Sequence, residues 1–173
     1  MTDTEMQLRY LLDRAEIERL LIRYCNATDA GDWDAVADCF AEDGGWAHRP
    51  GEGREQLRET FKQMFTRRSA ATPSPPTTSP KPATRLAPID RVEKEQHVLS
   101  NIEVDIADDT ASSFCAARVY IVGGRGEDAV LLMRGITYTD QLVRTPEGWK
   151  IKERAHHLVW MAETTPIEGA QVG

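Results

Sequence analysis

The sequence has no long hydrophobic run, no excess of basic residues and few cysteines. None of its apolar stretches approaches the roughly 20 residues that a membrane-spanning helix needs, and the N-terminal MTDTEMQLRY has no apolar centre of the kind found in signal peptides. With 21 basic and 28 acidic residues the formal net charge is −7, which disfavours a nucleic-acid partner. We therefore expect a soluble cytoplasmic protein that binds neither membranes nor nucleic acid.

Metal and cofactor signatures are also missing. The three cysteines, Cys25, Cys39 and Cys115, do not have the spacing of a metal or redox site, so free buried thiols are expected. The chain has no His-x-x-x-His helix, no nucleophile elbow, and no glycine-rich phosphate loop opening a helix. The sequence therefore predicts a protein without a metal ion or a bound cofactor.

Residues 14–40 form the stretch around which the remaining chain is organised. Apolar residues recur there at helical spacing, which predicts one helix, a turn and a second helix. Asp13 and Glu16 have the spacing of a capping box at the start of the first helix. Gly31 is suited to end that helix, and Asp32 to cap the next one.

Flanking segments complete the helical half of the chain. A short leading helix is expected over residues 4–12, a short strand over residues 45–50, and a third helix over residues 53–68. The segment 70–88 holds six of the nine prolines and few apolar side chains, so it is predicted to be extended or disordered. It is interpreted either as a solvated insertion or as a lid over a pocket.

The second half of the chain is typical of an antiparallel sheet. Its runs are rich in β-branched and aromatic residues and are separated by short turn signals. The four predicted strands cover residues 93–107, 110–122, 129–143 and 148–160. Helices followed by strands indicate an α+β fold, and 173 residues are expected to form one domain.

Three segments, RYCNATDAGDWDAVADCFAEDG, QHVLSNIEV and GWKIKER, resemble the SnoaL-like family of the nuclear transport factor 2-like superfamily. The resemblance is nearest to scytalone dehydratase, bile-acid 7α-dehydratase and hexachlorocyclohexane dehydrochlorinase. It implies a cone-shaped α+β fold, in which N-terminal helices pack on a curved antiparallel sheet and enclose a pocket.

Asp29 and His97 are the first candidates for catalysis. Asp29 falls in the last turn of its predicted helix, where the helix dipole disfavours a carboxylate. The resemblance implies that His97 lies inside the cone, opposite Asp29. A carboxylate bonded to one imidazole nitrogen fixes the tautomer and raises the basicity of the other nitrogen, so the pair would abstract protons near neutral pH. The alternative is a histidine satisfied by backbone or water.

Tyr24 and Arg154 are further catalytic candidates that rest on the resemblance to bile-acid 7α-dehydratase. It implies that both bind the substrate or stabilise developing negative charge. Their alternatives are a core tyrosine and a surface arginine. Thr28 and Ile121 stand where scytalone dehydratase has a tyrosine and its second catalytic histidine, so that enzyme's full catalytic set is not implied.

Strand alternation distributes the remaining candidates between two faces. It predicts that His97 and Leu99 lie opposite Ile102 and Val104. It also predicts one face with Arg154, His156, Leu158 and Trp160, opposite His157. Candidates for an apolar substrate pocket are Trp46, Phe114, Met133, His156 and Trp160, although aromatic residues in a small domain are often core residues.

These observations lead to a functional hypothesis with open alternatives. The favoured function is that of a cofactor-independent lyase, a dehydratase or related eliminating enzyme, acting on a small hydrophobic cyclic or aromatic metabolite. An isomerase or cyclase would use the same base. A non-catalytic ligand-binding protein, or a dioxygenase small subunit, is the rival from another class. By resemblance to the dehydratases we expect a homo-oligomer, with a trimer ahead of a dimer.

Overall fold

The computed structural model describes residues 2–49, 52–69, 89, 91–125 and 128–166 of the chain. Its elements are α1 (Asp3–Ala30), α2 (Trp33–Asp38), β1 (Phe40–Trp46), α3 (Gly53–Ser69), β2 (Arg91–Ala107), β3 (Thr110–Arg125), β4 (Asp128–Thr145) and β5 (Gly148–Thr164). The three helices all precede the four long strands, which confirms the predicted α+β order. The predictions for residues 70–88 fall outside the described residues.

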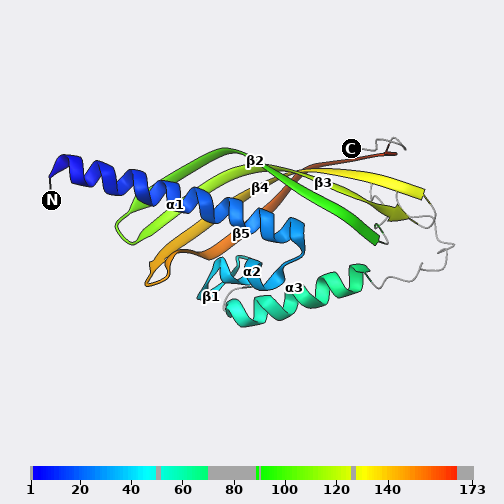
Figure 1. Cartoon of the computed structure of the whole chain (residues 1–173), viewed down its shortest axis with the longest axis horizontal. Coiled ribbons are helices and arrows are strands. Elements are labelled where there is room, and N and C mark those ends of the chain that lie inside the picture. The colour runs from blue at the N-terminus through cyan, green and yellow to red at the C-terminus, as the bar shows by residue number, and fades with distance from the viewer. Residues whose placement is uncertain (1, 50–51, 70–88, 90, 126–127, 167–173) are drawn as a thin grey trace, which may run out of the picture.

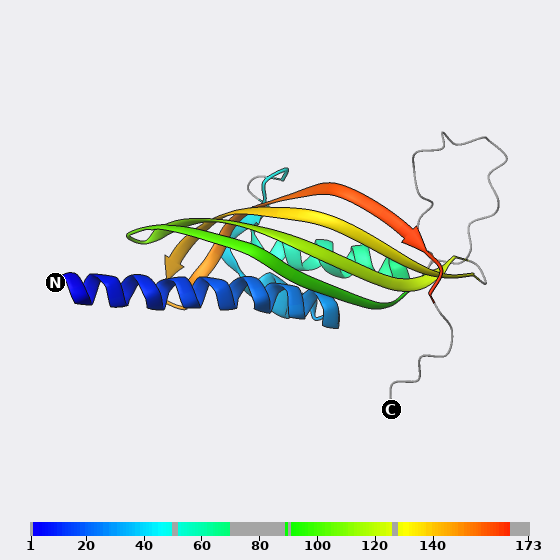
Figure 2. The same ribbon diagram turned by 90° about the horizontal axis from the view of Figure 1, so that it is seen from above.

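The strands form a five-stranded sheet in the order β1-β5-β4-β3-β2. The pairs β2–β3, β3–β4 and β4–β5 are antiparallel, as predicted, whereas β1 pairs with β5 in parallel. The sheet is strongly curved, and the three helices lie along one side of it (Figure 1, Figure 2). We call the side that carries the helices the inner face and the opposite side the outer face.

The hydrophobic core lies between the inner face and the helices. Its members include Ile17, Leu20, Leu21, Tyr24, Val36, Phe40, Leu57, Phe61, Val119, Ile121, Leu142, Trp149 and Ile151. The three cysteines are buried and free, which confirms the prediction made for them. In the part of the chain that the structure describes, no helix is both long enough and apolar enough to cross a membrane.

Helix α1 is a single helix, so the predicted break before Asp13 is wrong. Its capping box lies at the start of the chain: the Thr2 hydroxyl accepts from the Glu5 backbone N–H at 3.2 Å, and the Glu5 carboxylate accepts from the Thr2 N–H at 2.7 Å. Several apolar side chains of the first turns are more than half exposed, including Leu8, Leu11 and Leu12. Because these leucines do not extend the buried face that starts near Ile17, apolar periodicity does not show that the first turns belong to the same helix.

Asp13 and Glu16 contact the sheet instead of capping a helix. The Asp13 carboxylate accepts from Arg144 Nη1 and Nη2 at 2.7 and 2.6 Å and from the Trp149 indole N–H at 3.2 Å. Glu16 Oε1 accepts from the Trp149 backbone N–H at 2.9 Å. The Arg144 guanidinium also lies 4.5 Å from the centroid of the Trp149 ring. These contacts join the middle of α1 to the β4–β5 hairpin.

The turn after α1 has the predicted form. Gly31 has a φ of 69°, the left-handed conformation that ends a helix, and the Asp32 side chain accepts from the Ala35 backbone N–H at 3.0 Å. Helix α3 starts at the predicted Gly53 and ends one residue later than predicted, at Ser69. Local residue preferences are therefore enough to place these boundaries.

The first strand lies earlier than predicted, at Phe40–Trp46 rather than residues 45–50. Phe40 pairs with Ile151 of β5. Gly44 and Gly45 both lie inside the strand. A Cβ added at Gly44 would lie 2.6 Å from the Ile151 carbonyl oxygen, so glycine permits this close approach.

A bulge in β2 reverses the side-chain alternation. The register shifts at Asn101, whose φ is 51°, because an extra residue is inserted there. Val104 is consequently 6% exposed and Ile102 packs on the core, on the inner face that His97 also occupies. The prediction that these two residues lie opposite His97 is wrong.

A second bulge, in β5, moves Trp160 to the outer face. Leu158 pairs with Ile136, whereas Trp160 pairs with the preceding residue, Gly135. Because consecutive residues of β4 face opposite sides, Leu158 and Trp160 also do. The indole lies directly over Gly135, where an added Cβ would collide with it. The prediction that Trp160 shares a face with Arg154, His156 and Leu158 is therefore wrong for Trp160.

We predict that Asp13→Ala destabilises the protein by about 2 kcal/mol, because Arg144 and Trp149 lose their shared acceptor. The Arg144 hydrogen bond lowers the pKa of Asp13 below 3.8 in the folded state. The associated stabilisation is complete above the unfolded-state pKa and is lost as the pH falls through the lower folded-state pKa. Urea unfolding from neutral pH to about pH 2 measures the difference in free energy of unfolding between the native protein and Asp13→Ala. This difference should shrink as the pH falls.

The matched control is Asp105→Ala, at an exposed position of β2. It should change the free energy of unfolding by less than about 0.5 kcal/mol. If Asp13→Ala loses no more free energy of unfolding than Asp105→Ala does, Asp13 is not the link between α1 and the sheet.

Candidate active site

The end of α1 and the edge strand β2 bring Asp29 and His97 together. Asp29 Oδ1 lies 2.6 Å from His97 Nδ1, and Asp29 Oδ2 accepts from the His97 backbone N–H at 2.8 Å. The His97 side chain is 4% exposed and that of Asp29 is 20% exposed. The contact predicted between these two residues is therefore present in the structure.

This contact selects a tautomer of the imidazole. An ionised carboxylate can only accept hydrogen bonds, so the Nδ1 facing Asp29 carries the proton. In the neutral ring the Nε2 atom is then the nitrogen that can take up a proton. The second oxygen of Asp29 also accepts from a backbone N–H of β2, which is the edge strand of the sheet formed by the described residues. One carboxylate therefore orients the imidazole ring and satisfies a backbone N–H at the edge of the sheet.

Arg154 and Asp140 form a buried ion pair on the inner face. Arg154 is 1% exposed and Asp140 is 0% exposed. Arg154 Nε and Nη2 donate to Asp140 Oδ1 and Oδ2 at 2.7 and 2.8 Å, and the Ser113 hydroxyl donates to Oδ2 at 3.1 Å. Burial acts to lower the pKa of Arg154, but the charge and hydrogen bonds of Asp140 outweigh it and raise that pKa, so the guanidinium stays charged.

Two tyrosine rings flank the Arg154 guanidinium. Its Cζ lies 4.1 Å from the ring centroid of Tyr24 and 4.4 Å from that of Tyr138, at distances typical of cation–π contacts. The two rings also meet edge to face, with centroids 6.0 Å apart. Burial raises the pKa of the Tyr24 hydroxyl to about 12, so the phenol keeps its proton at neutral pH.

His156 and Trp46 add an aromatic group beside the ion pair. The ring centroid of His156 lies 5.7 Å from that of Tyr138 and 6.4 Å from that of Trp46. Partial burial, followed by the positive charges of Arg134 and Arg154, lowers the pKa of His156 below 6.5. His156 therefore lies within electrostatic reach of Arg154.

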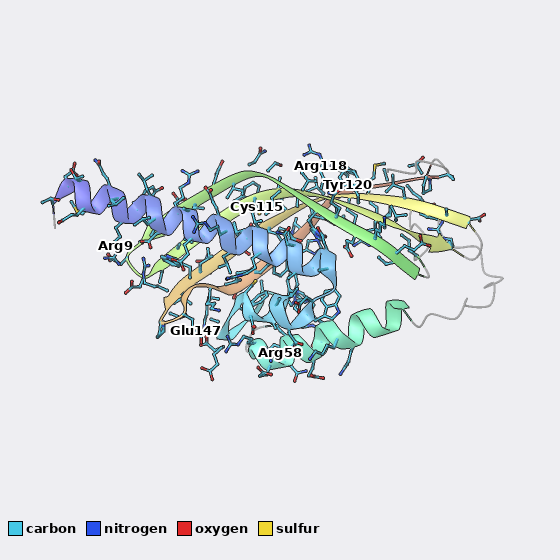
Figure 3. The ribbon with its side chains drawn as sticks, viewed as in Figure 1. Arg9, Arg58, Cys115, Arg118, Tyr120 and Glu147 are labelled. Atoms are coloured by element: carbon cyan, nitrogen blue, oxygen red, sulfur yellow. The ribbon has the colours of Figure 1, made fainter. Side chains whose placement is uncertain are left out.

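Three predicted substrate-binding residues lie on the other side of the sheet. Phe114 and Met133 occupy outward positions of β3 and β4, and Trp160 lies over Gly135 as described above. Figure 3 shows the same division on β3, where Arg118 and Tyr120 point away from the helices. The inner-face group thus contains Tyr24, Asp29, Trp46, His97, Arg154 and His156, without Phe114, Met133 and Trp160.

Sequence reasoning missed Asp140, Tyr138 and Ser113. A usable signal exists for two of them, because Ile136, Tyr138 and Asp140 alternate along β4 on one face with the core residue Leu142. A carboxylate on such a face needs a cationic or donor partner. No comparable signal marks Ser113, since serine is tolerated in many environments. Within the described ranges, no group of three or more His, Cys, Asp or Glu side chains is placed to hold a metal ion.

A family model described as a SnoaL-like domain matches residues 9–155. An uncharacterized protein of Mycobacterium tuberculosis (strain H37Rv) is 28% identical over 144 residues, covering 82% of each chain. A solved structure of a hexachlorocyclohexane dehydrochlorinase (LinA) type 2 has a TM-score of 0.67 at 16% identity, covering 96% of this chain and 99% of that one. A Novosphingobium aromaticivorans protein provisionally named scytalone dehydratase has a TM-score of 0.64 at 19% identity, covering 99% and 100%. At these identities the two structures share the fold of this chain.

We predict that Asp29→Ala speeds hydrogen exchange at the His97 amide by about tenfold, because that N–H loses its acceptor at the sheet edge. The measurement is amide exchange followed by nuclear magnetic resonance. Asn26→Ala, at an exposed position of the same helix, is the control and should leave the rate unchanged. Equal rates in the Asp29 variant and the native protein would contradict the structure at this contact.

Proposed function

The chain belongs to the SnoaL-like domain family, and on that premise we propose that it is a cofactor-independent lyase, which eliminates a small leaving group such as water from a hydrophobic cyclic or aromatic metabolite. The observation that carries the proposal is the 2.6 Å contact between Asp29 and His97 on the inner face. The dehydrochlorinase and dehydratase names of the two structural neighbours support it, because both name eliminations.

In this proposal His97 is the general base. Its Nε2 removes a proton from a carbon next to a carbonyl group, and the electrons of that C–H bond move toward the carbonyl oxygen to give an enolate. Asp29 holds the ring and balances the positive charge that forms on it. The imidazolium then protonates the departing hydroxyl group, a carbon–carbon double bond forms, water leaves, and His97 returns to its neutral state.

Tyr24 and Arg154 stabilise the enolate oxygen in this scheme. The phenol of Tyr24 is protonated at neutral pH and can donate a hydrogen bond. The Arg154 guanidinium supplies a fixed positive charge. Tyr24 and Asp29 both belong to α1, so one rigid helix contacts the cation through Tyr24 and the base through Asp29. Because both residues belong to one helix, the cation and the base are held at a fixed distance from each other, which suits a reaction that uses both groups.

The aromatic group beside the ion pair suits a planar or cyclic substrate. Trp46 contacts the rings of Phe40, Phe61 and His156. Because the pKa of His156 is lowered, its ring is neutral at neutral pH and adds no charge that would disfavour apolar surface. We therefore expect the ligand to stack on Trp46 and His156 and to place its carbonyl group toward Arg154.

We predict that His97→Gln lowers kcat/KM by about 10²–10⁴-fold, because a positioned general base contributes a factor of that size. The substrates to screen are cyclic β-hydroxy ketones, with elimination followed by the absorbance of the conjugated product. A second assay measures exchange of the proton next to the carbonyl with deuterium from solvent. An isomerase or cyclase would give exchange and a product without loss of water, and a binding protein would give neither reaction.

The matched control for His97 is His157→Gln. His157 pairs with Thr137 on the outer face, so its replacement should leave kcat/KM within about twofold of the native value. Circular dichroism confirms that both variants are folded. Full activity in folded His97→Gln protein would refute the proposed base.

A further inference from the structure

The Asp140–Arg154 pair is fully buried on the inner face of the sheet. Each residue is no more than 1% exposed. The carboxylate binds the guanidinium through Nε and Nη2, and the Ser113 hydroxyl binds the same carboxylate from β3. Two parallel N–H···O bonds define the direction of a guanidinium as well as its charge. Asp140 therefore controls how the Arg154 side chain is turned.

Two flanking tyrosine rings also restrict the movement of the Arg154 guanidinium. Tyr24 from α1 and Tyr138 from β4 lie 4.1 and 4.4 Å from Cζ, so movement of the cation would disturb contacts to both rings. With Asp140 bound to Nε and Nη2, and with both rings close to Cζ, the guanidinium has little freedom to move. This is more restraint than charge balance alone requires.

One nitrogen of this restrained guanidinium has no hydrogen-bond partner in the part of the chain that the structure describes. Arg154 Nη1 is buried and has no hydrogen-bond partner among the residues that the structure describes. Buried donors in folded proteins are almost always satisfied, so an unpaired one calls for an explanation. Nη1 is also the guanidinium nitrogen that Asp140 does not bind. Its free donors are suited to a ligand atom that accepts strongly.

We infer that Asp140 is a positioning residue, which holds Arg154 so that its Nη1 donates to a ligand oxygen that carries or develops negative charge. The ligand class is then a cyclic ketone that enolises or a phenol that binds as its phenolate. Ser113 assists by holding Asp140. This inference rests on the proposed function, in which Arg154 faces the substrate oxygen. The opposing interpretation is an ion pair that serves only the stability of the fold.

The probe for this inference is 4-nitrophenol, which absorbs visible light only as the phenolate, compared with its uncharged isostere 4-nitrotoluene. The native protein should bind the phenolate about tenfold or more tightly than the isostere, because a restrained cation favours the anion. Asp140→Glu keeps the charge and moves the carboxylate by one methylene group. It should lower the preference for the phenolate about tenfold and leave 4-nitrotoluene binding unchanged.

Arg154→Lys should abolish the preference, because lysine has no planar fork to be held by Asp140. The matched control is Arg118→Lys, at an exposed outward position of β3, which should bind both probes as the native protein does. Ser113→Ala adds no bulk to the core and should lower the preference about threefold, since it removes one hydrogen bond to Asp140.

Two outcomes would overturn the inference. One is a native protein that binds both probes equally. The other is an unchanged preference in Asp140→Glu or, if that variant does not fold, in Ser113→Ala. Neither outcome involves turnover, so each is distinguishable from failure of the proposed elimination, which the His97→Gln assay reports. A variant that loses affinity for both probes equally would indicate the purely structural ion pair.

Discussion

A positive charge at Arg154 lies inside the protein, and the neighbouring residues compensate for its burial. An isolated charge in such a place is strongly unfavourable, and removing one partner of a buried pair typically costs about 3–5 kcal/mol. Here Asp140 supplies the opposite charge, Ser113 satisfies part of the carboxylate, and two tyrosine rings cover the guanidinium. The strands β3, β4 and β5 and the helix α1 must therefore assemble correctly around a single cation.

Helix α1 connects this cation to the contact between Asp29 and His97. Tyr24 touches Arg154, and Asp29 binds both the ring and the backbone of His97. A carboxylate in the last turn of a helix is disfavoured by the helix dipole. Its two hydrogen bonds to the edge strand offset that cost, and they explain why an acidic residue occupies the position. The same contacts prepare His97 for proton transfer in the proposed mechanism.

Bulges in β2 and β5 decide which side chains join this group. Without the extra residue at Asn101, Ile102 and Val104 would face away from the core. Without the shift near Leu158, Trp160 would lie on the inner face with Arg154. Strict alternation, which is all that a strand pattern offers, mispredicts both. A bulge depends on the register of the neighbouring strand and on backbone conformations such as the positive φ of Asn101, and neither is visible in the spacing of apolar residues.

The sequence by itself determined the α+β order, the four long strands and the turn at Gly31, and it predicted the contact between Asp29 and His97, because each rests on local preferences or on a resemblance over most of the chain. Tertiary structure alone decided that Asp13 and Glu16 accept hydrogen bonds from the sheet, that β1 begins at Phe40, and that Asp140 forms an ion pair with Arg154. The physical reason is common to the three carboxylates. Carboxylates at helix-cap spacing, or on a strand, take whichever donors long-range packing brings within reach, and those donors lie far away in the sequence.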